Sequence, residues 1–382
     1  MEFSQLLTKL VRREDLTEPE VAFAVEYIAS RKATENPVAV GVLLALLAAK
    51  GETADEIAAF AKHMRAHSVN VQLPVRFTVA QSFQVLWVVS NVCWLRGEQV
   101  GRPMLGIVGT SGDGDGTNTV NLSTASAILA ASCGALVAKH GNRSVSSKAG
   151  SADVLEALGV PMLLPQNVAP CLEQAQITFL FRPNFHPAIR HVAPVRGAMG
   201  IRSVSNILGP LLNPAGCKRV VIGVYTPGLL LSFGEVLLRL GVEHGLVVHC
   251  AGLDELNSIG PADVVEIQQG IGTPLKCYKL HPKDVGVPPV TLKELQGGDA
   301  TANAVILRKV LGGGVASDSP VGNTIAYNAG AGLYVYGMVD TIKCGYEVAK
   351  KQLESGKALD ILENWAQVAQ QLHKQAQERI YK

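Results

Sequence analysis

The segment that says most about the fold and function of this chain is Lys139-His140-Gly141-Asn142-Arg143-Ser144-Val145-Ser146-Ser147. It follows the apolar run 135–138. Lysine supplies a point charge and arginine a planar fork, while the serines and backbone groups add hydrogen-bond donors. Small polar residues interleaved with cations directly after a strand are typical of a polyphosphate-binding loop. A solvated surface loop is the alternative, and it explains this mixture less well.

A glycine-rich stretch, 109–119, lies upstream between a predicted strand at 104–108 and a predicted helix at 123–132. Glycines let backbone N–H groups approach an anion, and the start of the next helix adds partial positive charge. No Gly-Lys-Ser/Thr follows, so this is not a Walker loop. From the local pattern alone, phosphate binding and an ordinary flexible turn remain equally open.

The pattern of apolar runs predicts the fold class. Further strands are expected at 177–181, 220–225 and 245–249, with a helix at 229–240 and mainly helical sequence from 300 onward. Apolar strands that alternate with helices indicate a mainly parallel sheet flanked by helices. We therefore predict an α/β protein whose large domain covers 104–382.

The N-terminal part predicts a small all-helical domain over 1–72, joined by helices from about 168–200. Its signals are a capping box at Thr17, an N-cap followed by proline at Asn36, and a second capping box at Thr53. Four short helices are expected here. An atypical connecting insertion, 73–103, separates this domain from the first strand.

Composition excludes several classes of protein. Hydrophobic residues make up 48% of the 382 residues and charged residues 17%, which excludes a disordered chain. The net charge of +2 argues against a nucleic-acid binder. The uncharged stretch 77–95 contains too many polar residues for a membrane span. The start of the chain lacks a signal-peptide pattern, so we expect a cytoplasmic protein, with a plastid left open if a targeting extension precedes it.

Two shorter motifs add candidate ligands. The pair Asp254-Glu255 follows the strand predicted at 245–249, where open α/β sheets bind ligands, and adjacent carboxylates suit Mg²⁺ together with phosphates. Taken alone, an acidic pair at a helix start is the more common explanation. Arg196 closes a basic stretch, 186–196, that is able to receive a carboxylate, whereas 205–214 has the pattern of a structural turn without chemistry.

Together these segments resemble the anthranilate phosphoribosyltransferase family, related to the pyrimidine nucleoside phosphorylases. The motifs that carry the resemblance are 109–113, 121–124, 139–147, 151–156, 206–214 and 253–255, and the likeness spans nearly the whole chain. The family implies a homodimer that uses Mg²⁺, two ions per active site, to join 5-phosphoribosyl 1-diphosphate to anthranilate. It implies no partnership with nucleic acid or membrane.

The resemblance also implies residue roles. Ser123, Asp254 and Glu255 would hold the Mg²⁺ ions, and Gly109, Asn142 and Arg196 would contact anthranilate. His140 is a candidate general base, without firm assignment. The implied contacts to phosphoribosyl diphosphate are Gly109, Gly112, Asp113, Thr119, Asn121, Leu122, Ser123, Thr124, Lys139, His140, Gly141, Asn142, Arg143, Ser144, Val145, Ser146, Ser147 and Ser151.

Three features depart from the family pattern, and two other functions stay open. Ser111 stands where the family loop usually has glycine, the loop is longer by about two residues, and the insertion 73–103 is unusual. A nucleoside phosphorylase of the same fold is the first alternative, although its loop lacks the Lys-His-Gly-Asn-Arg series. The second is a non-catalytic nucleic-acid-binding relative, against which the retained Asp254-Glu255 pair counts.

Overall fold

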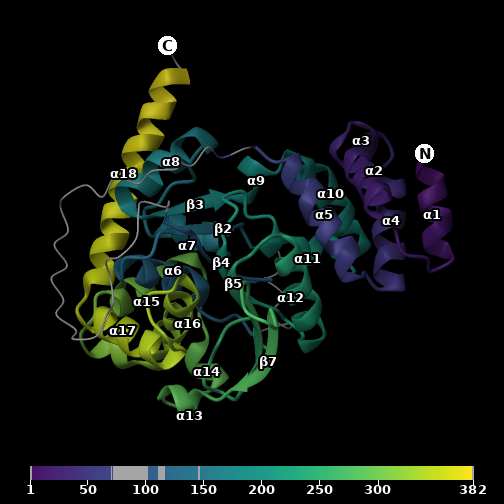
Figure 1. Cartoon of the computed structure of the whole chain (residues 1–382). Coiled ribbons are helices and arrows are strands. Elements are labelled where there is room, and N and C mark those ends of the chain that lie inside the picture. The colour runs from purple at the N-terminus through teal and green to yellow at the C-terminus, as the bar shows by residue number, and fades with distance from the viewer. Residues whose placement is uncertain (1, 70, 72–101, 111–116, 145–146, 381–382) are drawn as a thin grey trace.

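The computed structural model describes residues 2–69, 71, 102–110, 117–144 and 147–380. In this part of the chain a bundle of N-terminal helices lies beside a seven-stranded sheet that carries helices on both faces (Figure 1). The predicted α/β class with a mainly parallel sheet is confirmed. The predicted site residues Gly112, Asp113, Val145 and Ser146 lie outside the described residues, as does 73–101 of the connecting insertion.

The sheet has the order β3-β2-β1-β4-β5-β6-β7, in which β1 to β5 run parallel and β6 and β7 run antiparallel. Its strands are β1 (Leu105–Gly109), β2 (Val137–Gly141), β3 (Ile177–Phe181), β4 (Arg219–Gly223), β5 (His244–Cys250), β6 (Ala262–Gln268) and β7 (Leu275–Leu280). The predicted apolar strands are present with small shifts at their ends. Strands β6 and β7 were not predicted from the sequence, and β2 extends further than its apolar run, so that Lys139 and His140 belong to the strand.

The N-terminal bundle is built from α1 (Phe3–Val11), α2 (Glu18–Ala29), α3 (Lys32–Glu35), α4 (Pro37–Lys50) and α5 (Ala54–Ala66). Both predicted capping boxes, at Thr17 and Thr53, are present, and the Asn36 side chain accepts a hydrogen bond from Ala39 N. The prediction of four helices missed the one-turn helix α3. These caps satisfy amide groups that would otherwise lack partners at the helix starts.

Residues from the middle of the chain return to this bundle. After the single turn α9 (Arg182–Phe185), helix α10 (Pro187–Met199) packs on α2, α3 and α4. The next helix, α11 (Val204–Leu211), contacts α4 and α5 on one side and β2 on the other. The segment 205–214, expected to be a structural turn, is therefore largely a helix, which corrects that expectation; its glycine and prolines concealed the helical pattern.

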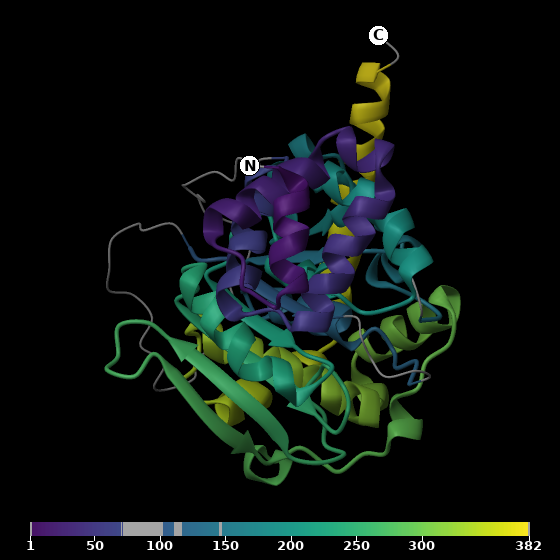
Figure 2. The ribbon, with the colours of Figure 1, turned by 90° about the vertical axis from the view of Figure 1, so that its right-hand side faces the viewer.

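Helices on the two faces of the sheet complete the layers. On one face, α6 (Leu122–Ser132) and α16 (Pro320–Tyr336) contact the parallel strands, with α17 (Ile342–Glu354) and α18 (Lys357–Ile380) packed outside them. On the other face, α12 (Leu230–Arg239) contacts β5 and β6 and also packs against α5 (Figure 2). The remaining elements are α7 (Ser151–Ala157), α8 (Pro165–Ala175), α13 (Pro282–Val285), α14 (Leu292–Leu295), α15 (Ala300–Leu311) and the 3₁₀ turns η1 (Pro227–Leu229) and η2 (Gly314–Asp318).

The core is continuous between the layers. Aliphatic residues of the sheet and of α6 and α16 are fully buried, and the indole of Trp365 on α18 is buried with them. Among the described residues, no helix combines the length and the apolar character needed to cross a lipid bilayer. The end of α18 extends away from the body of the molecule in both views (Figures 1 and 2).

Candidate active site

The parallel strands end in register, and three neighbours among them, β2, β1 and β4, end in glycine. Gly109 of β1 pairs with Gly223 of β4, which places both at the carboxyl edge of the sheet. A β carbon on Gly109 would lie 2.7 Å from Asp254 Cγ, and one on Gly223 would lie 3.0 Å from Asp254 Cα and overlap its carbonyl. The missing side chains therefore make the space in which Asp254 sits, so glycine is required at both positions.

Asp254 is held at this edge by Thr110. The aspartate is 4% exposed, and the Thr110 hydroxyl donates to Asp254 Oδ2 at 3.4 Å. The backbone N–H of Thr110 bonds Gly223 O, and Tyr225 N donates to the Thr110 hydroxyl. One threonine thus ties the end of β1 to the end of β4 and to the acidic pair. Neither Thr110 nor Gly223 was given a role from the sequence.

Lys139 lies beneath the same edge. Its side chain is 1% exposed, and Nζ donates to Ile107 O at 3.2 Å and to Ser123 Oγ at 3.4 Å. Burial lowers the pKa of Lys139 to about 8, and the charges of Glu255 and Asp254 partly oppose that shift. Lys139 and Ser123 are therefore in contact, and the negative charges of Glu255 and Asp254 act on the Lys139 ammonium. A buried ammonium at such a site gains from an added anion.

The donors at this site fit Mg²⁺. Two carboxylates and one hydroxyl are hard oxygen ligands of the kind that Mg²⁺ accepts alongside phosphate oxygens and water. No cluster of three or more His, Cys, Asp or Glu ligands occurs among the described residues, so they offer no complete cage for a softer metal. The donor set therefore suits an ion that arrives with a phosphorylated substrate.

The start of α6 presents the second predicted motif. Asn121 occupies the N-cap position, but its side chain donates to Ala149 O and accepts from Asn303 Nδ2, both at 3.0 Å. Asn121 therefore joins the loop before α7 to α15. Leu122 and Thr124 are fully buried, and their N–H groups donate to Val120 O and Asn121 O, whereas Ser123 offers a partly exposed hydroxyl. Thr119 lies nearby, paired with Gln296 in an isolated bridge.

The loop after β2 is organised by acids of α7. Arg143 binds Asp153 at 3.0 Å and Glu156 at 2.6 Å, and these partners raise the pKa of its guanidinium. Ser144 N donates to Asp153, and the hydroxyls of Ser144 and Ser147 lie 2.8 Å apart. Arg143 is thus neutralised by the protein in this conformation.

Close packing fixes the base of that loop. Asn142 accepts from Arg143 N through Oδ1, and its carbonyl accepts from the Ser151 hydroxyl at 3.4 Å. A β carbon on Gly141 would overlap Ser151 Oγ, so the start of α7 lies directly against the end of β2. Ser151, Asn142 and Gly141 are therefore brought together at the carboxyl edge.

His140 occupies a buried, basic neighbourhood on the side of the sheet that faces α11. Its Nδ1 lies 3.1 Å from Gly209 O, and its ring meets the ring of His186 edge-on with centroids 5.4 Å apart. A carbonyl only accepts, so Nδ1 carries the proton and donates. Burial lowers the pKa of His140 well below its usual range, and His186 and Arg182 lower it further. His140 is therefore a neutral imidazole whose Nε2 is an acceptor.

Arg182, His186 and Arg196 share this basic neighbourhood. Arg182 follows β3 directly, and burial together with Arg196 lowers its pKa to about 10. Burial and Arg182 lower the pKa of His186 to about 4, so His186 is neutral at pH 7. Arg196 was singled out from the sequence and Arg182 was not, although its position right after the strand 177–181 was a usable signal.

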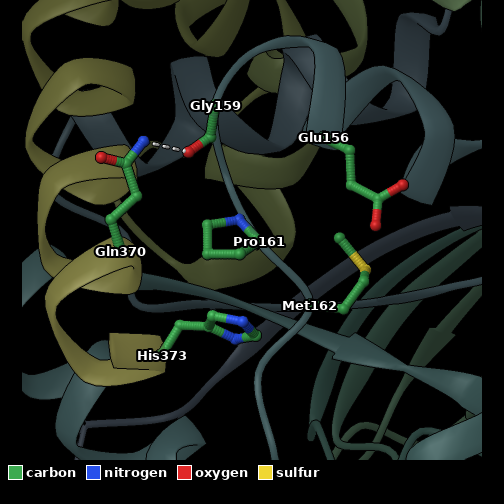
Figure 3. A pocket seen from close by; sticks show the side chains of 6 residues that line it. All are labelled: Glu156, Gly159, Pro161, Met162, Gln370 and His373. Carbon is green, nitrogen blue, oxygen red and sulfur yellow. Dashed lines mark hydrogen bonds between the residues drawn. The ribbon is translucent and has the colours of Figure 1, made fainter. Parts of the chain in front are cut away.

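A separate cavity lies away from this edge. Its volume is about 360 Å³, and it opens between the segment after α7 and helix α18, as Figure 3 shows. The residues that line it are Glu156, Gly159, Pro161, Met162, Gln370 and His373. Glu156 shares its carboxylate with Arg143, and Gln370 donates to Gly159 O at 2.7 Å. None of the predicted ligand-binding residues that the structure describes lines this cavity.

Known proteins resemble the chain over nearly its full length. Residues 101–359 match the α/β domain of a glycosyl transferase family, and 4–68 match its helical bundle domain. A protein of Thermomicrobium roseum named anthranilate phosphoribosyltransferase is 40% identical over 360 residues, which cover 94% of each chain.

Solved structures agree with this match. The anthranilate phosphoribosyltransferase of Thermus thermophilus superposes with a TM-score of 0.81 and 39% identity, covering 96% of this chain and 99% of its own. The Saccharomyces cerevisiae enzyme in complex with PRPP and Mg has a TM-score of 0.81 at 26% identity, covering 97% and 98%. The same yeast enzyme has also been solved with 4-fluoroanthranilate.

Proposed function

The chain belongs to the anthranilate phosphoribosyltransferase family, and from this we propose that the carboxyl edge of its sheet carries out the family's reaction. The phosphoribosyl group of 5-phosphoribosyl 1-diphosphate passes to the amine of anthranilate, giving N-(5-phosphoribosyl)anthranilate and diphosphate in tryptophan biosynthesis. The observation that carries the assignment is the buried Lys139 beside Ser123, coupled to Asp254 and Glu255.

The phosphate donor binds along the start of α6 and the loop after β2. Negative charge grows on the departing diphosphate, so fixed donors aimed at it stabilise the transition state. Lys139 supplies a desolvated ammonium, and the N-terminus of α6 adds partial positive charge beside the Ser123 hydroxyl. The serines at 144, 147 and 151 complete this set of donors, and Arg143 joins them when it exchanges Asp153 and Glu156 for the diphosphate.

Mg²⁺ would be bound beside the phosphoribosyl diphosphate, as the yeast enzyme solved in complex with PRPP and Mg suggests for this family. We assign Asp254, Glu255 and Ser123 to hold it, and we propose two ions per site. Bound Mg²⁺ would neutralise charge on the diphosphate. Thr110 keeps Asp254 in place for this role, and the glycine ends of β1 and β4 leave room for it.

Anthranilate is the acceptor, in contact with Gly109, Asn142 and Arg196. The Arg196 guanidinium pairs with its carboxylate, and Arg196 Nε is shielded from solvent without a hydrogen-bond partner among the described residues. The amine then attacks the ribose carbon from the face opposite the diphosphate. Correct placement of the two substrates supplies much of the rate, because no protein group becomes covalently attached.

His140 serves the acceptor's amine as a hydrogen-bond acceptor. Its Nδ1–H is committed to Gly209 O, which leaves the Nε2 lone pair for an N–H donor. With a pKa far below neutrality, His140 is a weak base, so it orients the amine better than it stores a proton. We therefore assign His140 a role in orientation.

A second copy of the chain is the expected partner. Helix α4 is apolar around its circumference, and Val38 and Val42 on it are 72% and 39% exposed. Val11, at the end of the adjacent α1, is 67% exposed. A helix that is apolar on every side needs cover, so this face supports a homodimer formed through the bundle. We place the dimer in the cytoplasm, in keeping with its bacterial relatives.

The two other functions are less well supported. Nucleoside phosphorolysis and nucleic-acid binding are not the activities for which the relatives described above are named. Mixing the protein with phosphoribosyl diphosphate, Mg²⁺ and anthranilate should abolish the fluorescence of anthranilate. Unchanged fluorescence at high protein concentration would reject the proposal, and phosphorolysis of uridine or thymidine would favour the phosphorylase.

A further inference from the structure

Arg182 stands at the same edge of the sheet as the acceptor residues. It begins α9 immediately after β3 ends, and its Nη1 lies 3.5 Å from the position of a β carbon on Gly209. The carbonyl of that same Gly209 accepts from His140 Nδ1 at 3.1 Å. The guanidinium of Arg182 and the imidazole of His140 therefore flank one residue.

The positive charge of Arg182 is not balanced by the described part of the protein. Arg182 Nε and Arg196 Nε are both shielded from solvent and have no hydrogen-bond partner there. No ion pair joins either arginine to an acid among the described residues, whereas Arg143 binds both Asp153 and Glu156. A buried guanidinium without a counter-charge gains strongly from an incoming anion.

The neighbouring histidines carry no charge at pH 7, so they neither balance the positive charge of Arg182 nor add to it. His140 and His186 are 3% and 1% exposed, and burial lowers the pKa of both, so each is neutral at pH 7. The neighbourhood therefore presents the guanidinium groups of Arg182 and Arg196 beside two neutral imidazoles, and Arg65 acts on both imidazoles as a further positive charge. No carboxylate from the described residues is paired to Arg182 or Arg196. This combination favours an aromatic acid over a neutral aromatic ring.

We propose that Arg182 is a specificity-determining residue that binds the carboxylate of the acceptor together with Arg196. Two planar forks offer more donors to one carboxylate than a single arginine does, and each such charge-assisted bond is strong when desolvated. Arg182 thereby selects arylamines that carry a carboxylate over those that lack it. The inference rests on the proposed function, because it concerns that reaction's acceptor.

The test compares Arg182→Gln and Arg182→Lys with the wild type and with Arg239→Gln. Arg239 is a largely exposed arginine that pairs with Asp55, so its variant controls for the loss of a surface charge. Arg182→Gln should raise the KM for anthranilate by about 10- to 100-fold, because a charge-assisted bond is lost. The KM for phosphoribosyl diphosphate should stay within about twofold, and Arg182→Lys should recover part of the loss.

The preference for one arylamine over another is a measurement that a purely structural role of Arg182 would leave unchanged. The wild type should prefer anthranilate over aniline, and Arg182→Gln should narrow that preference by about tenfold or more. An unchanged anthranilate KM with unchanged preference would overturn the proposal. So would an effect confined to the KM for phosphoribosyl diphosphate, because that result assigns Arg182 to the donor.

Direct binding separates this inference from the proposed function. Equilibrium dialysis of the wild type with anthranilate should show competition by benzoate and little by benzamide. If Arg182→Gln misfolds, as judged by circular dichroism, Arg182→Lys and this competition decide the matter, and equal competition by benzamide would refute the proposal. If the wild type binds anthranilate through Arg182 but shows no turnover, the proposed function is wrong and the assignment of Arg182 stands.

Discussion

Gly109 is packed directly against Asp254: a β carbon on the glycine would lie 2.7 Å from the Cγ of the carboxylate. The same aspartate accepts from Thr110, the next residue along the chain. The end of β1 and the acidic loop after β5 are therefore in direct contact, although Thr110 and Asp254 lie 144 positions apart in the sequence. Changes at Gly109 are transmitted straight to the predicted metal ligand.

The Gly109→Ala substitution should displace Asp254 without unfolding the sheet. We expect kcat/KM to fall by about 100-fold, since misplacing a positioned group by about an ångström has an effect of this order. Steady-state kinetics with circular dichroism would measure both. Gly272→Ala is the matched control, because a β carbon there meets nothing within 4 Å and should leave the kinetics unchanged. Full activity of the Gly109 variant would contradict this account of the site.

The Asp254→Asn and Glu255→Gln substitutions keep the shape of each side chain and remove its charge. Turnover should fall by about 100-fold or more, with a higher Mg²⁺ concentration needed for half-maximal rate. Titration of activity against Mg²⁺ would measure the effect. Asp263→Asn, which removes an exposed partner of Lys279, should leave the Mg²⁺ requirement as it was. An identical Mg²⁺ dependence in all variants would refute the assignment of Asp254 and Glu255.

Glu56 anchors the helical bundle. Its side chain is 1% exposed, accepts from Leu16 N and pairs with Lys50 at 2.8 Å. Glu56→Ala should lower the free energy of unfolding by about 3 kcal/mol, because it removes the buried acidic partner of Lys50, which keeps only the exposed Asp15, and leaves the buried Leu16 N–H without its acceptor. Urea denaturation would measure this loss. Glu18→Ala, which breaks the exposed pair with Lys62, should cost much less, and equal losses would show that burial is not decisive.

His186 should make stability depend on pH. Its pKa is about 4 in the folded protein against 6.5 as its ordinary value, so the unfolded chain binds the proton more readily. Its contribution is complete above about pH 6.5 and is lost as the pH falls toward 4, with a total of about 3 kcal/mol. In the His186→Asn variant, the urea concentration at the unfolding midpoint should depend less on pH between about pH 7 and 4.5 than it does in the wild type. The exposed His67→Asn variant should retain the wild-type slope, and parallel profiles for all three proteins would count against this origin.

The parallel half of the fold was predictable because its strands are continuous apolar runs, as at 177–181. Strands β6 and β7 were not predicted because their sequences are not continuous apolar runs. Strand β6 contains Asp263 and Glu266, and β7 is half-exposed, with lysines at 276 and 279. Antiparallel strands that face water on one side carry a weaker apolar signal. The helix at 204–211 escaped because it contains a glycine and a proline.

The candidate site was predictable only where a single segment contained the chemistry. Lys139, Asp254 and Glu255 were predicted as ligands from their place after apolar runs, and the parallel register brings the ends of those strands to one edge of the sheet. The roles of Thr110 and Arg182 depend on which strands are neighbours and on what remains buried without a counter-charge. Local sequence records neither property, because both arise from packing between distant segments.

The outermost strand β7 limits how copies of this protein assemble. It forms one border of the sheet, and Lys276 and Lys279 stand exposed along a run of only six residues. Lysines on a short border strand oppose the docking of another β-ribbon, because every added copy would crowd like charges together. Fibril-like stacking through this border of the sheet is therefore disfavoured.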